Sequence, residues 1–379
     1  MFAAKLCVDL HIANEEMCDE VIALNGPDII YIVEHAENAT AEDICGMTEN
    51  PTLKVLHLAD THFDPKYSPG ANITCDQMYL CCREGSGTPE DPNDGAGFWG
   101  SMGNCDIPRW SLEALYQYIS DNNPDIDFII WTGDIVPHNS WSTSREYNLD
   151  VINEMADLVS SYFPGIPVFP AVGNHEANPA NLFPQPYITD PDFDISWLYD
   201  ELNEIWQRWL PSDVAKSVAY GAFYSTQIRP GLRIASVNTQ YCYINQFDAE
   251  DKGDFVYIIG HIPAGSFDCN YAWSHEFNKN YFQLYFDPQN SSRVYEIAYI
   301  AQSQTTFVDL NPGFKIYTIE GDFNGTRYRV IDHENWYLDL EQSNSINDSL
   351  PDLSPRSWLD LVYRMNEPNS TLFSDFYSI

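Results

Sequence analysis

Four short stretches of this chain each place metal-binding side chains directly after an apolar run, and this repeated arrangement constrains the fold most strongly. The sharpest is Gly173–Asn174–His175–Glu176, which follows the apolar run Ile166–Phe169. The other three are Asp60-x-His62 after Leu53–Leu58, Gly133–Asp134 with His138 after Phe128–Trp131, and Gly260–His261 after Phe255–Ile259. Short apolar runs bounded by turn residues predict buried strands, and the carboxyl edge of a parallel sheet presents loops to a ligand. Four such strand ends therefore predict one shared metal site.

The residue types at these strand ends suit a pair of metal ions. Asp60 and His62 are alternate residues leaving a strand, so both can point to one side. The Asp134 carboxylate can bridge two cations about 3.5–4 Å apart. Asn174 offers an amide oxygen and His261 an imidazole nitrogen. A mixed oxygen and nitrogen set suits Zn, Mn or Fe rather than a thiolate-bound metal.

Two further histidines accompany these candidate ligands. Paired cations can bind phosphate oxygens and convert water to hydroxide, which would leave His138 and His175 to orient the phosphate or protonate the leaving oxygen. Each motif alone has a structural alternative, because Gly133–Asp134 can be a simple turn and His261 a core histidine. Taken together and in order, the motifs favour hydrolysis of a phosphate ester.

The charge of the chain limits its partners. A net charge of −38 and a pI of about 4.2 argue against nucleic-acid binding, which requires a basic surface. Protonation of carboxylates would relieve self-repulsion, so an acidic compartment is compatible with this charge, although a solvated acidic surface explains it equally well. The sequence contains no apolar run of about 18 residues, so we expect no transmembrane segment.

The cysteines and glycosylation sequons indicate a protein that passes through the oxidising secretory pathway. Nine cysteines together with several Asn-x-Ser/Thr sequons favour a secretory-route protein. The sequons begin at Asn38, Asn72, Asn290, Asn324, Asn347 and Asn369. The first residues, Met1–Cys7, lack the apolar core of a signal peptide, and an odd cysteine count leaves one thiol over. We therefore interpret the N-terminus as truncated.

The order of the expected elements indicates an α/β fold. Residues 1–47 carry apolar residues near helical spacing, including Ile29–Val33, and predict a short helical segment followed by a linker over 48–52. From residue 53 strands and helices alternate, with helices expected over 108–119, 143–163 and 196–209. Three later strands without intervening helices, over 295–300, 314–319 and 328–338, predict a second, antiparallel sheet. We thus expect two sheets flanked by helices over 53–340 and a helical extension over 341–379.

In this order, the four motifs resemble those of the metallophosphatase (calcineurin-like phosphoesterase) superfamily and, more narrowly, of the acid sphingomyelinase family. The resemblance covers nearly the whole chain from residue 53, and residues 7–47 resemble the second half of a saposin-type domain. The matching stretches are Asp60–Asp64, Cys81–Arg83, Trp131–Asp134, Pro170–Glu176, Gly260–Pro263 and Leu361–Met365. The fold that the resemblance implies is a two-sheet metallophosphatase sandwich with a truncated saposin-like N-terminal piece.

The resemblance also implies an activity. Family members are secreted or lysosomal phosphodiesterases that hydrolyse sphingomyelin to ceramide and phosphocholine at a two-zinc centre, and we expect a monomer that meets its substrate at a membrane or lipoprotein surface. The implied ligands are Asp60 and His62 for the first zinc, Asn174 and His261 for the second, and Asp134 as the bridge. His138 and His175 would contact the phosphate and the leaving group. The implied disulfides are Cys7–Cys18, Cys75–Cys81, Cys82–Cys105 and Cys242–Cys269, which leave Cys45 over.

One motif of the family pattern is missing. The family ends its site with Gly-His-x-His, and no His-x-His occurs in this sequence. Residues 277–286 occupy the place where that motif is expected but contain no histidine. The segment between Cys242 and Gly260 is also shorter than in the family. Zinc accepts three protein ligands and a water molecule, so the remaining ligands can still hold each metal. The alternative is a catalytically impaired relative that binds a lipid or phosphate ligand.

Overall fold

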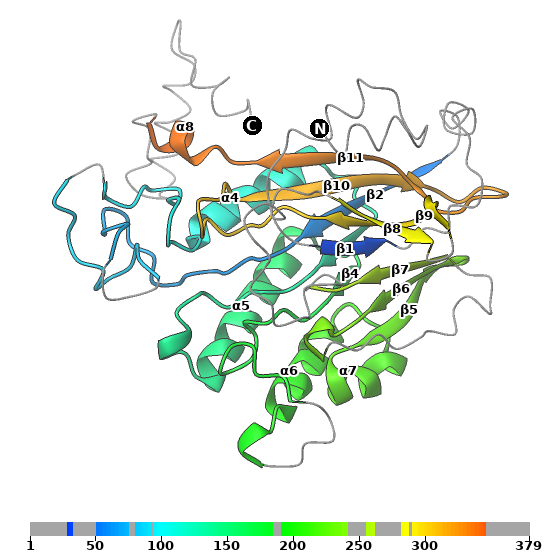
Figure 1. The fold of residues 1–379 in the computed structure, drawn as a ribbon, viewed down its shortest axis with the longest axis horizontal. Helices are drawn as coiled ribbons and strands as arrows, with labels where there is room; N and C mark the ends of the chain where they lie inside the picture. Colours follow the sequence, from blue (N-terminus) through cyan, green and yellow to red (C-terminus); the bar gives the residue numbers. More distant parts are fainter. Residues whose placement is uncertain are drawn as a thin grey trace, which may run out of the picture.

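The computed structural model describes residues 29–32, 51–75, 80–91, 94–184, 191–241, 255–261, 282–287 and 290–345. Two β-sheets form the centre of this structure (Figure 1). The strands of the five-stranded sheet, in spatial order, are β11 (Val330–Tyr337), β10 (Gly313–Glu320), β2 (Thr52–Leu58), β3 (Phe128–Trp131) and β4 (Val168–Pro170). Strands β2, β3 and β4 run parallel, so their carboxyl ends lie at one edge of this sheet.

The six-stranded sheet contains a second parallel pair. Its strands, in spatial order, are β5 (Tyr224–Arg229), β6 (Leu232–Ser236), β7 (Phe255–Ile259), β1 (Ile29–Ile32), β9 (Asn290–Ile300) and β8 (Phe282–Asp287). Strands β6 and β7 run parallel, and every other neighbouring pair is antiparallel. This sheet therefore also presents the carboxyl end of a parallel strand, that of β7.

The predicted α/β class and the two-sheet arrangement are confirmed, but two details of the prediction are wrong. Residues Ile29–Ile32 form strand β1 between β7 and β9 rather than part of a helix, because β-branched side chains fit a pleated sheet better than a helix. Strands β10 and β11 do not join β9 in a second sheet, since β10 pairs with β2. Apolar periodicity identifies a strand but does not identify its neighbour. The rest of the N-terminal piece and the part of the expected helical extension after residue 345 lie outside the described residues.

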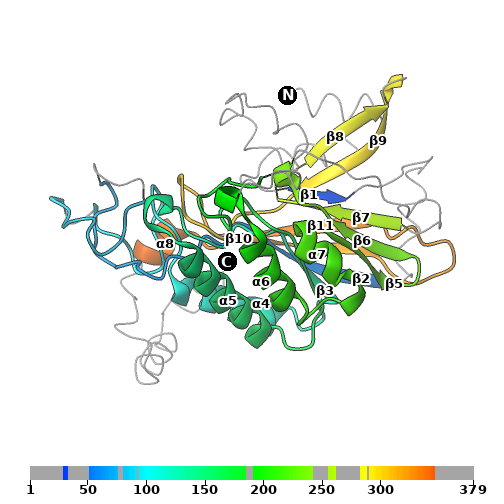
Figure 2. The same ribbon diagram turned by 90° about the horizontal axis from the view of Figure 1, so that it is seen from below.

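The described part of the chain contains five helices. They are α4 (Arg109–Asn122), α5 (Arg145–Tyr162), α6 (Ser196–Trp206), α7 (Ala215–Gly221) and α8 (Leu340–Ser345), with short 3-10 turns at Ser140–Ser142, Pro191–Phe193, Ser212–Val214 and Thr239–Tyr241. Figure 2 shows α4, α5 and α6 side by side, and their buried side chains share one hydrophobic core with β2 and β3. The Ser144 hydroxyl caps α5 by accepting from the Tyr147 N–H at 3.1 Å, which fixes where the chain turns after the β3 loop.

The long loop after β2 is held by covalent bonds. The structure contains the disulfides Cys75–Cys81 and Cys82–Cys105, the two pairings that the family resemblance implies for this loop. The other two implied pairs lie outside the described residues. Among the sequons within the described part, Asn324 is exposed and Asn72 is half-buried. Among the described residues there is no helix with the length and apolar character needed to cross a membrane.

Candidate metal centre

The five predicted metal ligands lie together where the two sheets meet. Asp60 and His62 follow β2, Asp134 follows β3, Asn174 follows β4, and His261 follows β7. Ligand atoms of Asp60, His62 and Asp134 all lie within 4.8 Å of one another, and all three residues are buried. His261 joins this cluster from the other sheet, with its Nε2 atom 2.9 Å from the Asn174 amide oxygen. The predicted convergence of strand ends is therefore present in the structure.

Asp134 occupies the centre of the cluster. Its Oδ2 atom lies 3.2 Å from Nε2 of His62 and 3.2 Å from Nε2 of His261. Its Oδ1 atom accepts a hydrogen bond from the backbone N–H of His175 at 2.7 Å. Burial raises the pKa of Asp134, but the neighbouring charges of His261, His175 and His62 outweigh burial and hold that pKa well below its usual range. One carboxylate oxygen thus faces two imidazoles while the other is fixed by the backbone.

Backbone carbonyls fix the orientation of both imidazoles. Nδ1 of His62 lies 2.8 Å from the Val136 carbonyl oxygen, and Nδ1 of His261 lies 3.1 Å from the Thr132 carbonyl oxygen. Because a carbonyl oxygen only accepts, each Nδ1 carries a hydrogen, and in the neutral ring, which is the form that binds a metal ion, the lone pair is on Nε2. This is the arrangement in which metal-binding histidines are usually held.

The loops approach one another more closely than a side chain would permit. Asp60, His62 and Asp134 all have positive φ angles, of 43°, 37° and 56°, which non-glycine residues rarely adopt. A Cβ atom on Gly133 would lie 2.5 Å from the backbone nitrogen of Gly173, and one on Gly173 would lie 2.3 Å from that of Asp134. Glycine is therefore required at both positions for the Asp134 and Asn174 loops to meet. Strained backbone of this kind is typical of functional sites.

The buried donor set fits metal ions. The Oδ1 atom of Asp60 is buried and accepts no hydrogen bond from any residue that the structure describes, and Nδ1 of His261 lies 3.5 Å from it. A buried carboxylate oxygen without a donor is costly unless a cation compensates it. Together with the lone pairs of His62 and His261, this oxygen provides ligand atoms that suit a cation.

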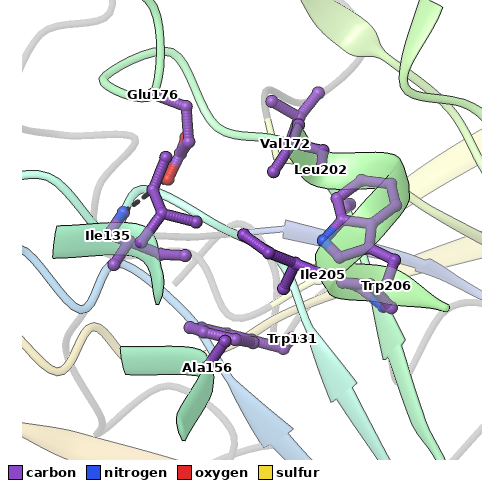
Figure 3. A pocket seen from close by; sticks show the side chains of 11 residues that line it. Trp131, Ile135, Ala156, Val172, Glu176, Leu202, Ile205 and Trp206 are labelled. Carbon is purple, nitrogen blue, oxygen red and sulfur yellow. Dashed lines mark hydrogen bonds between the residues drawn. The ribbon is translucent and has the colours of Figure 1, made fainter. Parts of the chain in front are cut away.

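Glu176 supports the Asp134 loop from behind. Its Oε1 atom accepts from the Ile135 N–H at 2.7 Å and its Oε2 atom from the Asp134 N–H at 3.3 Å. Figure 3 shows Glu176 at the wall of a small cavity whose other labelled side chains are apolar, among them Trp131 and Leu202. Burial, and then the charge of Asp134, raises the pKa of Glu176 to about 7. This carboxylate is therefore placed to hold the bridging-ligand loop rather than to contact a ligand.

The two predicted non-ligand histidines border the same cluster. The rings of His138 and His175 lie 3.9 Å and 4.8 Å from that of His62, centre to centre, and 4.7 Å from each other. Burial, followed by the charge of His175, lowers the pKa of His138 to about 3, so a neighbouring anion is needed to favour its protonated form. Nδ1 of His138 lies 2.7 Å from the carboxylate of Asp106, a residue that no motif in the sequence singled out.

Comparison with known proteins decides the family. A family model described as calcineurin-like phosphoesterase matches residues 53–290. Sphingomyelin phosphodiesterase of Homo sapiens is 34% identical over 99% of this chain and 72% of the relative, and that of Bos taurus is 32% identical over 99% and 73%. The chain belongs to the sphingomyelin phosphodiesterase family of calcineurin-like phosphoesterases. Sphingomyelin phosphodiesterase 2 of Caenorhabditis elegans is also similar, at 28% identity over 99% of this phosphoesterase and 77% of the relative.

Family membership makes the phosphoesterase a hydrolase that works with metal ions, and the cluster described above is a possible site for them. The alignment with the human relative spans 463 residues, although this phosphoesterase has 379, so the relative has residues within this region that this chain lacks. Residues 242–254 and 262–281 lie outside the described residues.

Sequence reasoning missed residues that support this site from loops without periodicity. Asp106 follows Cys105 in the long loop, and Thr305 and Phe307 precede β10. Asp106 follows no strand, and the stretch after β9 that leads to Thr305 and Phe307 contains no Asp, Asn or His, so no pattern signal indicated them. The Asn148 amide was also missed, and it donates to the carbonyl oxygens of residues 175, 176 and 177, which fixes the loop after Asn174 onto α5.

Proposed function

We propose that this chain is a metal-dependent phosphodiesterase that hydrolyses sphingomyelin to ceramide and phosphocholine. The observation that carries the proposal is the approach of His62 and His261, from different sheets, to the same oxygen of Asp134, at 3.2 Å each. The similarity to the human sphingomyelin phosphodiesterase over 99% of the chain supports the choice of substrate. A lipid phosphodiester also suits a chain whose net charge of −38 disfavours polyanionic substrates.

The roles that we propose for the residues follow from their positions. Asp60 and His62 would hold one ion, Asn174 and His261 would hold the other, and Asp134 would be the ligand shared by both. The oxygen and nitrogen donors suit zinc. Bound ions would polarise the phosphate and lower the pKa of a water molecule. His138 and His175, which border the cluster, would orient the phosphate and protonate the leaving oxygen.

We further propose the setting of this activity. The domain organisation is a partial saposin-like segment over 1–47, from which Ile29–Ile32 joins the catalytic sheet as β1, a linker over 48–52, a catalytic domain over 53–340 and an extension over 341–379. The disulfides in the loop after β2 and the exposed sequon at Asn324 support a secreted or lysosomal glycoprotein. We propose that it acts as a monomer on sphingolipid at a membrane or lipoprotein surface.

The test is turnover of sphingomyelin by the purified full chain. Phosphocholine release from sphingomyelin in detergent micelles is measured at pH 5, with and without added zinc, beside the Asp134→Ala variant. We expect zinc-dependent release by the wild-type chain and none above background by the variant. Equal release by the two proteins, or none by either, would reject the proposal.

The alternative is a relative that binds a lipid or phosphate ligand without turnover. The observation that favours it is the absence of His-x-His from the sequence. Metal analysis of the folded protein separates the two: about two tightly held ions per chain support the enzyme. Binding to sphingomyelin vesicles without stoichiometric metal or turnover supports the alternative.

A further inference from the structure

The ring of His138 is held on several sides. Its Nδ1 atom lies 2.7 Å from Oδ1 of Asp106, and its backbone N–H donates to Oδ2 of the same carboxylate at 2.7 Å. One face of the ring stacks on Phe307 at 3.9 Å, and the ring also stacks on His62 at 3.9 Å. Because Nδ1 faces an oxygen that only accepts, Nε2 is the ring atom left for a substrate.

Asp106 has its own support. The residue is completely buried, and its Oδ1 atom accepts a further hydrogen bond from the Thr305 hydroxyl at 2.9 Å. The backbone N–H of Thr305 in turn donates to the Asp60 carbonyl oxygen at 2.9 Å, and the Gln304 N–H donates to the Ala59 carbonyl oxygen at 3.1 Å. The segment before β10 thus connects the carboxylate behind His138 to the loop that carries Asp60.

The Asp106 carboxylate accepts three hydrogen bonds. Because these use the lone pairs that a metal ion would need, Asp106 does not act as a metal ligand in this arrangement. Two come from His138 and one from Thr305, and all are 2.9 Å or shorter. Side chains at such positions orient a neighbouring group rather than contact the substrate.

We propose that Asp106 is a positioning residue that orients Nε2 of His138 toward the leaving oxygen. Thr305, which bonds both Asp106 and the Asp60 backbone, fixes the position of this pair relative to the Asp60 loop. The inference rests on the proposed function. The attacking water molecule gives one proton to the solvent, and as its oxygen forms a bond to phosphorus, the bond from phosphorus to the ceramide oxygen breaks and its electron pair stays on the ceramide oxygen. The protonated ring transfers its Nε2 proton to the same oxygen, while the Nδ1 hydrogen stays with Asp106.

The leaving group separates this role from a merely structural one. Sphingomyelin and 4-nitrophenylphosphorylcholine carry the same phosphocholine group, but ceramide leaves as a basic alkoxide that needs a proton and nitrophenolate does not. For Asp106→Asn we expect kcat on sphingomyelin to fall about 100- to 10,000-fold, the range that general acid catalysis contributes. We expect less than about a tenfold loss on the nitrophenyl substrate, with KM and metal content unchanged.

Two variants complete the test. Asp64→Asn is the matched control, because Asp64 is also buried but pairs with Arg83 rather than with His138, so it should affect both substrates equally. Thr305→Val removes a single hydrogen bond and should show the Asp106→Asn pattern with a smaller loss, which keeps the test valid if Asp106→Asn fails to fold.

The outcomes distinguish the two proposals. Equal losses on both substrates for Asp106→Asn and Thr305→Val, or no loss for either, would overturn the positioning role while sphingomyelin hydrolysis by the wild-type chain stands. A wild-type chain that hydrolyses neither substrate would reject the proposed function itself, and the positioning role with it.

Discussion

The backbone N–H of His175 donates to Oδ1 of Asp134 at 2.7 Å, and this bond determines how the carboxylate faces the site. With Oδ1 engaged, Oδ2 is the oxygen that points between His62 and His261. The residue that follows Asn174 thus orients the carboxylate that follows β3. Two sequence motifs that are about 40 residues apart act as one unit for this reason.

The first prediction concerns Asp134 itself. In Asp134→Asn an amide replaces the carboxylate, so the negative charge between the two imidazoles is lost. We expect bound metal to fall below half of the wild-type content and sphingomyelin turnover to fall more than about 100-fold, which exceeds the usual effect of a residue that only supports a ligand. Metal analysis and phosphocholine release measure both. Asp332→Asn, an exposed acid on β11, is the control, and a normal metal content in Asp134→Asn would contradict the assignment.

The second prediction concerns Glu176. In Glu176→Gln one acceptor of the Asp134 and Ile135 N–H groups becomes an amide donor, so one buried N–H loses its partner. We expect the free energy of unfolding to fall by about 1–3 kcal/mol and the metal dissociation constant to rise about 10- to 100-fold. Urea unfolding and competition with a chromogenic chelator measure these changes. Glu113→Gln, on the surface of α4, should change neither, and an unchanged metal affinity in Glu176→Gln would show that the loop does not need this carboxylate.

The third prediction concerns the buried pair of Arg83 and Asp64. The guanidinium contacts both carboxylate oxygens at 3.0 Å, and the two side chains are 6% and 0% exposed. Arg83→Met should reduce the free energy of unfolding by roughly 3–5 kcal/mol, because it leaves a buried charge without its partner. The double variant Arg83→Met/Asp64→Leu should recover part of that loss in urea unfolding. A double variant less stable than Arg83→Met would argue against the charge as the cause.

The fourth prediction is a pH dependence caused by His57. This residue is completely buried, with Nε2 3.1 Å from the Thr132 hydroxyl, and burial followed by the charge of Lys315 lowers its pKa well below 6.5. Below pH 6.5 the unfolded chain binds a proton at His57 that the folded chain does not, so acidification favours unfolding. This contribution amounts to about 1.4 kcal/mol per pH unit between 6.5 and the folded pKa.

The His57→Gln variant isolates this contribution. It should be less stable than the wild-type chain at pH 8, and the difference should shrink as the pH falls to 5, because only the wild-type chain loses stability through this histidine. Thermal or urea unfolding at pH 8, 6.5 and 5 provides the comparison. A difference that stays constant over this range would show that His57 binds a proton equally well in the folded and unfolded chains.

Local sequence pattern was sufficient for the strands that carry the ligands. The apolar runs before Asp60, Asp134 and Asn174 form neighbouring parallel strands, because β2, β3 and β4 are buried on both faces and leave their polar residues at the edge. The apolar run before His261 likewise forms β7. Residues that act at strand ends are therefore visible in a single sequence.

Long-range pairing was not visible in the sequence. The run over 314–319 has the same pattern in either sheet, and only its register with β2 decides its place. Asp106 is another example, since its partner His138 is brought to it by the disulfide-bonded loop and by the segment before β10. Contacts between segments far apart in the chain leave no periodic signal.

The seam between the two sheets carries a final consequence. The Pro170 carbonyl oxygen at the end of β4 accepts hydrogen bonds from the hydroxyl groups of Tyr224 and Ser236, and the Thr132 carbonyl oxygen accepts one from His261, so polar bonds join the two sheets beside the cluster. An ion that takes ligands from both sheets would cross-link them at this junction. Each tenfold increase in free metal above the dissociation constant should then add about 1.4 kcal/mol to the free energy of unfolding. A chelator should lower the melting temperature and increase the rate of proteolysis.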